Sequence, residues 1–220
     1  MNADIVSYYK DRAKEYEKIY SKPERQEDLK SATTILQEIF AGKQVLEIAC
    51  GTGYWTEKIA AKATSIFATD INETVIDVAK KKDLSSKQVS FGIADIYNFS
   101  DPNKFESLFG GFIWSHILLG DLDKFLSTVN SLVSPGGTVV LMDNNFVVGS
   151  NHPITKKDEQ GNCFQTRKLE DNTTHLVLKN FPTEIFLRNK LKDISSECKI
   201  FNLTYYWIIC YTTKTNNNNE

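Results

Sequence analysis

Residues 45–56 read VLEIACGTGYWT, an apolar, strand-like run followed by two glycines one residue apart and then a helix-forming segment. Glycine lets a ligand approach the backbone, and the N-terminus of a following helix favours a negative group. A P-loop would need a Lys that is absent, and a G-x-G-x-x-G loop would have Ala49 and Tyr54 where it needs glycine. The stretch therefore predicts a ligand site that fits a molecule with one carboxylate better than one with a phosphate.

Composition predicts one domain with a near-neutral surface. The chain has 220 residues, with 26 Lys and Arg against 28 Asp and Glu. This balance does not indicate a nucleic-acid partner. The four cysteines form no C-x-x-C pair, which argues against a zinc ribbon and favours a reducing, cytoplasmic location. No signal peptide is evident and no run reaches the roughly 18 apolar residues of a membrane helix, so we expect no membrane partner.

Short apolar runs alternate with amphipathic segments, which is typical of a parallel sheet flanked by helices. Strands are expected at 45–49, 65–70, 89–94, 112–115 and 138–143. Helices are expected at about 54–62, after an N-capping Asn72, and from Asp121, while Ser134–Gly137 is expected to be a turn. Two final runs, 199–203 and 205–211, are joined too tightly for a crossover and should be antiparallel.

The flanking regions predict caps on a single domain spanning residues 1–215. Residues 1–42 read as two helices, residues 43–143 as the ligand-binding core, and residues 146–182 as an insert with a hairpin turning around Asp171-Asn172. A helix should follow Pro182. The polar tail, residues 216–220, is expected to be disordered.

Acids stand at three successive strand positions, Glu47, Asp70 and Asp95. A single Asp at a strand end usually forms a turn or caps a helix. Three in succession, the first leading into G-x-G, favour a ligand site, because a carboxylate after the second strand can accept two hydrogen bonds from a ribose diol. Residues 47–53, E-x-A-x-G-x-G, resemble the first motif of class I S-adenosylmethionine-dependent methyltransferases, with Ala49 where many members have Gly. The resemblance covers about residues 43–143.

This resemblance implies a Rossmann-like α/β fold: a seven-stranded, mostly parallel sheet with one antiparallel strand and helices on both faces. It also implies S-adenosylmethionine as the cofactor. Asp70 would bind the ribose and Asp95 the adenine amino group, while Ile96 would offer its backbone N–H to the ring and Ile71 would pack on it. The amino-acid arm of the cofactor would rest on the first loop, which contains Glu47, Ala49, Gly51 and Gly53.

A spacing of four relates Tyr8, Arg12, Tyr16 and Tyr20 in the N-terminal stretch, with Tyr9 beside the first. On an α-helix this spacing places them on one face. Methyltransferases with a similar Tyr-bearing helix often fold it over the cofactor as a lid. We expect Tyr9 and Tyr16 to contact the cofactor and Tyr8 and Tyr20 to pack on the domain.

The fourth strand end bears on the methyl acceptor. Members of the family that methylate nucleobase amines or protein glutamine carry an [N/D]-P-P-[Y/F] turn at this place. This chain lacks that turn, which argues against such an acceptor. His116 is a candidate general base, with an unperturbed pKa of about 6.5; the alternative is a histidine bonded to loop backbone. Asp143-Asn144 resembles the Asp-Asn pair of metal-dependent, catechol-type methyltransferases, which complete a magnesium site with an Asp at the fourth strand end. Ser115 and His116 stand there instead, so we expect loop capping and no metal.

The hairpin carries Arg167, Lys168 and His175, which either bind an acidic substrate or form its solvated face. The sequence as a whole predicts methyl transfer from S-adenosylmethionine to an oxygen or nitrogen of a small molecule. The alternatives are a non-catalytic cofactor-binding module and an NAD-type oxidoreductase. The oligomeric state stays open.

Overall fold

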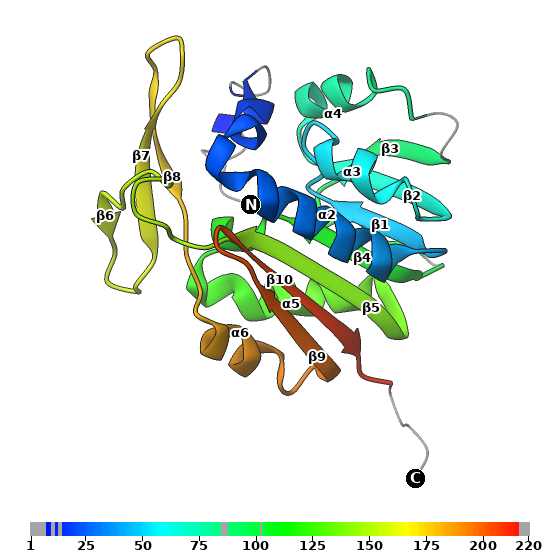
Figure 1. Cartoon of the computed structure of the whole chain (residues 1–220). Helices are drawn as coiled ribbons and strands as arrows, with labels where there is room; N and C mark the ends of the chain where they lie inside the picture. The colour runs from blue at the N-terminus through cyan, green and yellow to red at the C-terminus, as the bar shows by residue number, and fades with distance from the viewer. Residues whose placement is uncertain (1–7, 10–11, 13–14, 85–87, 102, 216–220) are drawn as a thin grey trace.

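The computed structural model describes residues 8–9, 12, 15–84, 88–101 and 103–215 (Figure 1). Within these residues, seven strands form the central sheet: β1 Gln44–Ile48, β2 Ser65–Asp70, β3 Val89–Ile93, β4 Phe105–Gly111, β5 Val133–Asn144, β9 Ser195–Asn202 and β10 Tyr206–Thr213. Their order is β3-β2-β1-β4-β5-β10-β9. Of these seven, β10 alone runs antiparallel, between β5 and β9. The predicted Rossmann-like sheet is confirmed.

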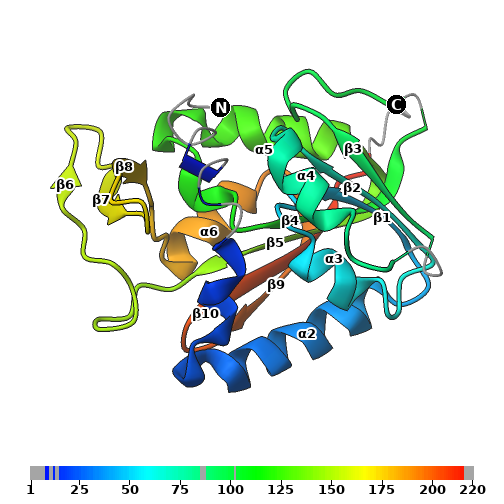
Figure 2. The ribbon, with the colours of Figure 1, turned by 90° about the horizontal axis from the view of Figure 1, so that it is seen from above.

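Helices cover both faces of the sheet (Figure 2). The helices α2 Gln26–Phe40, α3 Tyr54–Ile59 and α4 Glu73–Ala79 contribute to one core cluster, and α5 Leu122–Ser131 and α6 Glu184–Leu191 to the other. Strand β5 supplies both clusters, because successive side chains point to opposite faces. Val139 and Leu141 enter one cluster, and Val140 and Met142 the other.

The fourth strand is Phe105–Gly111, so the prediction of a strand at 112–115 is wrong. Two consecutive glycines disfavour a strand locally. Here, pairing with β1 and β5 on either side overrides that preference. At Gly110 a Cβ would lie only 2.9 Å from the Leu141 side chain, so the glycine lets these strands pack. Residues 112–115 begin the loop after β4, which contains the short 3₁₀ helix η4 Trp114–His116.

The N-terminal segment also differs from its prediction. Helix α2 is confirmed, but in place of one long helix before it lie two 3₁₀ turns, η1 Tyr16–Ser21 and η2 Pro23–Arg25. Contacts with the core replace the expected face of tyrosines: Tyr20 stacks on Tyr54 with ring centres 3.7 Å apart. Tyr8, Tyr9 and Arg12 are helical, as predicted for the first helix. Residues 1–7, 10–11 and 13–14, and the tail predicted to be disordered, lie outside the described ranges.

The insert forms a second sheet of β6 Lys156–Lys157, β7 Cys163–Lys168 and β8 Thr174–Leu178, which projects from the body (Figure 1). The predicted hairpin is confirmed, with Asn172 at φ +70° in its turn. Strand β6 was not predicted. No helix in the described part of the chain has the length and hydropathy of a membrane span.

Residues 134–137 are part of β5 rather than a free turn, although the pairing of β4 with β5 shifts register there.

A Cβ on Gly137 would lie 2.4 Å from Val133 Cγ1 and 2.8 Å from the carbonyl oxygen of Glu106. We therefore expect Gly137→Ala to lower the free energy of unfolding by about 1–3 kcal/mol. Gly120→Ala is the control, because nothing lies within 4 Å of its added Cβ. Urea unfolding would measure both, and equal midpoints would contradict the expectation.

Candidate active site

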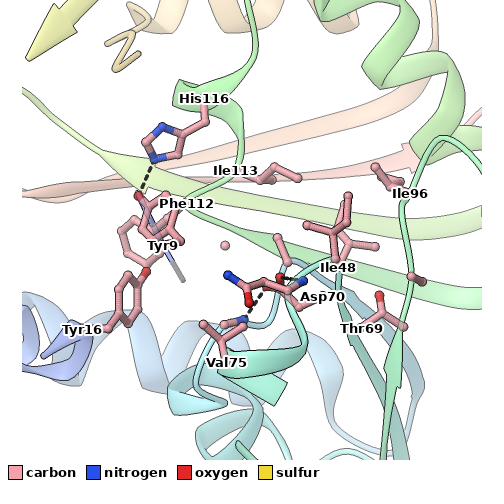
Figure 3. A pocket seen from close by; sticks show the side chains of 16 residues that line it. Tyr9, Tyr16, Ile48, Thr69, Asp70, Val75, Ile96, Phe112, Ile113 and His116 are labelled. Atoms are coloured by element: carbon pink, nitrogen blue, oxygen red, sulfur yellow. Dashed lines mark hydrogen bonds between the residues drawn. The ribbon is translucent and has the colours of Figure 1, made fainter. Parts of the chain in front are cut away.

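A cavity lies at the carboxyl ends of β1, β2, β3 and β4, where the chain crosses from one side of β1 to the other (Figure 3). Its walls include Gly51, Ile71, Ile96 and Phe112, each from the loop after a different strand. The cavity encloses about 790 Å³, its open mouth included. This volume and position are those of a small-molecule site in an open α/β sheet.

The loop after β1 is held in left-handed backbone conformations, with φ of 52° at Ala49, 56° at Gly51 and 76° at Gly53. Gly53 packs on α4, where an added Cβ would lie 3.1 Å from Ala79 Cβ. Gly53 therefore shapes the loop and does not line the cavity. Gly51 leaves its backbone open, since an added Cβ would meet only the Tyr16 ring, at 3.9 Å.

Asp70 ends β2 and is tied to the glycine loop. Its Oδ2 accepts from the Gly51 N–H at 3.0 Å and its Oδ1 from the Asn72 N–H at 2.9 Å. Burial raises the pKa of the carboxyl, and these backbone hydrogen bonds oppose the shift. A carboxylate has about four acceptor sites, so both oxygens retain capacity for a ligand diol. The predicted residues Ile71 and Ile96 add apolar walls beside it.

Glu47 lies behind the loop and outside the cavity wall, with 1% of its surface exposed. Burial raises its pKa to about 8; the Thr56 hydroxyl opposes this shift and the charge of Asp70 adds to it. Its Oε2 has no hydrogen-bond partner in the described residues. This buried, unpartnered oxygen suits a nearby ammonium group, which would lower the pKa of Glu47.

Asp95 does not line the cavity. Its Oδ1 accepts from the Tyr97 N–H at 3.1 Å and its Oδ2 from Asn98 Nδ2 at 2.9 Å. These are the bonds of a residue that closes a turn. The predicted contact of Asp95 with adenine stays a prediction.

Tyr9 and Tyr16 line the cavity on the side opposite Asp70 (Figure 3). Their rings meet edge to face with centres 5.7 Å apart. Tyr8 is buried against Leu169 and Val177 of the insert. The N-terminal segment thus reaches from the glycine loop after β1, near Tyr16, to the hairpin, near Tyr8.

His116 stands between the tyrosines and the insert. Its Nδ1 is 2.6 Å from the Leu178 carbonyl oxygen and its Nε2 is 2.7 Å from the Tyr9 hydroxyl. A carbonyl only accepts, so Nδ1 carries the proton and Nε2 accepts from Tyr9. Burial, with the charges of Lys179 and Arg167, holds the pKa of His116 well below its usual range. The side chain thus binds backbone of strand β8 rather than of its own loop, and it also presents an unprotonated nitrogen toward the cavity.

Lys179 forms a buried ion pair that the sequence did not reveal. Its Nζ lies 2.8 Å from Asp143 Oδ1 and donates to Ser115 Oγ at 2.6 Å, while Asp143 Oδ2 accepts from the Ser115 N–H at 2.9 Å. The only sequence signal was a lysine inside the apolar run LVLKNF.

Asp143 also accepts from the Asn144 N–H, as a capping residue does. The described residues contain no cluster of three metal-ligating side chains.

A second cavity, of about 890 Å³ with its open mouth, shares Tyr9, Tyr16 and Phe112 with the first. Phe112 has φ +60°, which is rare for a bulky side chain. Arg167 lines this second cavity and is only 8% exposed, so the solvated-face interpretation is wrong for it. Lys168 is exposed, and His175 packs on Tyr8.

Residues 45–137 match the family model described as "Methyltransferase domain". Malonyl-[acyl-carrier protein] O-methyltransferase 1 of Ilyobacter polytropus is 24% identical over 143 residues, which are 62% of this chain and 52% of that one. Phosphoethanolamine N-methyltransferase 1 of Triticum aestivum is 26% identical over 153 residues, 67% of this chain and 27% of that one. The alignments thus span about half of the first relative and less of the second.

A solved DhpI–SAH complex has the same fold, with a TM-score of 0.79 at 23% identity and 96% of each chain covered. The domain match, the relatives and the fold together support a class I S-adenosylmethionine-dependent methyltransferase. The similarity to this class lies in the domain match at residues 45–137, and a second solved structure of the same fold, a DhpI-SAM-HEP complex, has a TM-score of 0.75 at 23% identity.

Ala49 occupies a backbone conformation that favours glycine, so Ala49→Gly should raise the free energy of unfolding by about 0.5–1 kcal/mol. Ala68→Gly is the matched control: Ala68 lies buried in regular strand β2, and its replacement should lower stability by a similar amount. Thermal unfolding of both variants would measure the difference. A loss of stability in both would mean that Ala49 is unstrained.

Proposed function

We propose that the protein transfers a methyl group from S-adenosylmethionine to an oxygen or nitrogen of a small molecule. The observation that carries this proposal is the junction of two cavities at Tyr9, Tyr16 and Phe112. One cavity has the strand-end features of a nucleoside site. The other offers a separate space for an acceptor, with the unprotonated nitrogen of His116 close to both.

The residues of the first cavity fit the cofactor. Asp70 would accept from the ribose hydroxyls, and Ile71 and Ile96 would enclose the base. The open backbone at Gly51 would receive the amino-acid arm, while the predicted contact of Glu47, which lies behind this loop, stays a prediction. When bound, S-adenosylmethionine supplies a methyl group already activated by its sulfonium. The chain must then align the acceptor atom opposite the sulfur and exclude water.

His116 is positioned to remove the acceptor's proton. Its Nδ1–H is anchored on the Leu178 carbonyl, which leaves Nε2 as the only acceptor on the ring. The Tyr9 hydroxyl now donates to Nε2 and would either yield its place to an acceptor hydroxyl or relay the proton. A base is needed only for a hydroxyl or a protonated amine.

The alternatives are a non-catalytic cofactor-binding module and an NAD-type oxidoreductase. A non-catalytic module would need no second cavity beside the first. An oxidoreductase would need a G-x-G-x-x-G loop, and this loop has Ala49 and Tyr54 where the first and third glycines would stand. A cytoplasmic location is part of the proposal, because all four cysteines are free thiols.

Calorimetry with S-adenosylhomocysteine and NADH tests the cofactor assignment. Asp70→Ala should weaken homocysteine-nucleoside binding at least tenfold by removing the diol acceptor, and Gly51→Val should do so by strain at φ +56° and by filling the cavity. Asp77→Ala is the control, since Asp77 is exposed on α4. Binding of NADH alone, or undiminished binding in both folded site variants, would reject the assignment.

A labelled-methyl screen of small-molecule extracts would identify the acceptor and allow His116 to be tested as a base. Because the pKa of His116 is lowered, the unprotonated ring persists through neutral pH, and the parent's rate should fall only well below pH 6.5. His116→Ala should lower kcat about 10²–10⁴-fold, and His175→Ala should not. Retained turnover in His116→Ala, with S-adenosylhomocysteine binding intact, would remove His116 as the base.

A further inference from the structure

The second cavity, called here the acceptor cavity, is lined by basic side chains from three segments. They are Arg12, Lys18, Lys22, Arg25, Arg167 and Lys179. No Asp or Glu from the described residues lines it. The chain as a whole carries a formal net charge of −2, so this concentration of positive charge is local.

The three lysines each pair with a carboxylate, and the three arginines do not. Lys18 pairs with Glu170, Lys22 with Glu24 and Lys179 with Asp143. The three arginines have no carboxylate within 4.0 Å among the described residues. A buried, charged side chain without a counter-charge is costly unless hydrogen bonds satisfy it.

Hydrogen bonds satisfy Arg25 but leave Arg167 with free donors. Arg25 donates to Asn144 Oδ1 and Ser150 Oγ, so it links the N-terminal segment to the end of β5 and to the insert. Arg167 donates from Nε and Nη2 to one oxygen, Gln165 Oε1, at 3.2 and 2.7 Å, and from Nη1 to the Tyr8 hydroxyl at 3.5 Å, which leaves two of its five N–H groups unused. Gln165 is itself fixed by donating to the His152 carbonyl at 2.6 Å. The guanidinium fork is thus oriented while part of its donor capacity is unused.

Arg12 adds a second guanidinium on the tyrosine side. It lies over the rings of Tyr8 and Tyr16, at 5.7 and 5.4 Å from their centres. Its side chain forms no hydrogen bond to a residue that the structure describes. The guanidinium of Arg167 also lies over the Tyr8 ring, 5.6 Å from its centre, so one tyrosine contacts both arginines.

The positive field also acts on a neighbouring group. The pKa of His152, another residue of the acceptor cavity, is lowered by burial and by the charges of Arg167, Arg12 and Lys22. These features favour a ligand that brings negative charge into the cavity, because planar guanidinium groups bind carboxylate and phosphate oxygens with paired hydrogen bonds.

Building on the proposed function, we propose that the methyl acceptor is an anionic small molecule, whose carboxylate or phosphoryl group is bound by Arg167 with Arg12. Its nucleophile then lies toward the wall that Tyr9 and Tyr16 share with the first cavity. Arg25 positions this cavity and does not bind the anion.

The test is calorimetric titration of inorganic phosphate and of acetate into protein saturated with S-adenosylhomocysteine. We expect at least one anion to bind, and its binding to weaken tenfold or more in Arg167→Met and in Arg12→Met. The control is Arg188→Met, which removes the same charge from exposed helix α6, where Arg188 pairs with Glu184. Preference for phosphate over acetate, or the reverse, identifies the group.

S-adenosylhomocysteine binding, measured on each variant, reports folding and separates the two proposals. Loss of that binding in the parent would reject the proposed function. Retained nucleoside binding without binding of either anion, or equal losses in Arg188→Met, would overturn only the anionic acceptor. A labelled-methyl reaction on extracts divided by anion exchange adds a second readout. Anionic molecules are retained by the exchanger, so label found only in the unretained fraction would also overturn the proposal of an anionic acceptor.

Discussion

The buried ion pair between Lys179 and Asp143 fixes the geometry on which the rest of the site depends. Taking two charges out of water costs several kcal/mol per ion, so the pair holds only with good geometry and further hydrogen bonds. The backbone N–H of Ser115 and the hydroxyl of the same residue supply them. Because Asp143 lies near the end of β5 and Lys179 follows β8, the pair fastens the insert to the sheet. The Leu178 carbonyl is thereby placed on His116.

Local patterns predicted the parallel sheet, the glycine loop, the Asn72 cap and the tight antiparallel pair at the end, because each depends on residues close in sequence. The failures share a cause in long-range contacts. Strand β4 is set by its neighbours on both sides, and the stacking of Tyr20 on Tyr54 accompanies a 3₁₀ turn where a helix was expected. Lys179 could not be paired with Asp143, since nothing local links residues 36 positions apart.

Among the described residues, two of the four non-glycine residues with left-handed φ follow adjacent strands at the cavity. Ala49 follows β1 and Phe112 follows β4, and both have left-handed φ. Sheet-edge hydrogen bonds hold them there: the N–H of Cys50 donates to the Thr69 carbonyl at 3.0 Å, and that of Phe112 to the Met142 carbonyl at 2.6 Å. Strained residues persist where the surrounding structure over-determines them, and they gather at functional sites. Both residues here line the first cavity.

The charges proposed to select the acceptor also set the state of His116. Arg167 and Lys179 oppose protonation of the imidazole, so His116 is available to accept a proton but is a weak base. An anion bound at Arg167 would offset part of that positive field and raise the pKa of His116 toward its usual range. Base strength follows pKa, so proton removal would become easier when an acceptor of the right charge is present. In this arrangement one electrostatic environment would contribute to both specificity and catalysis.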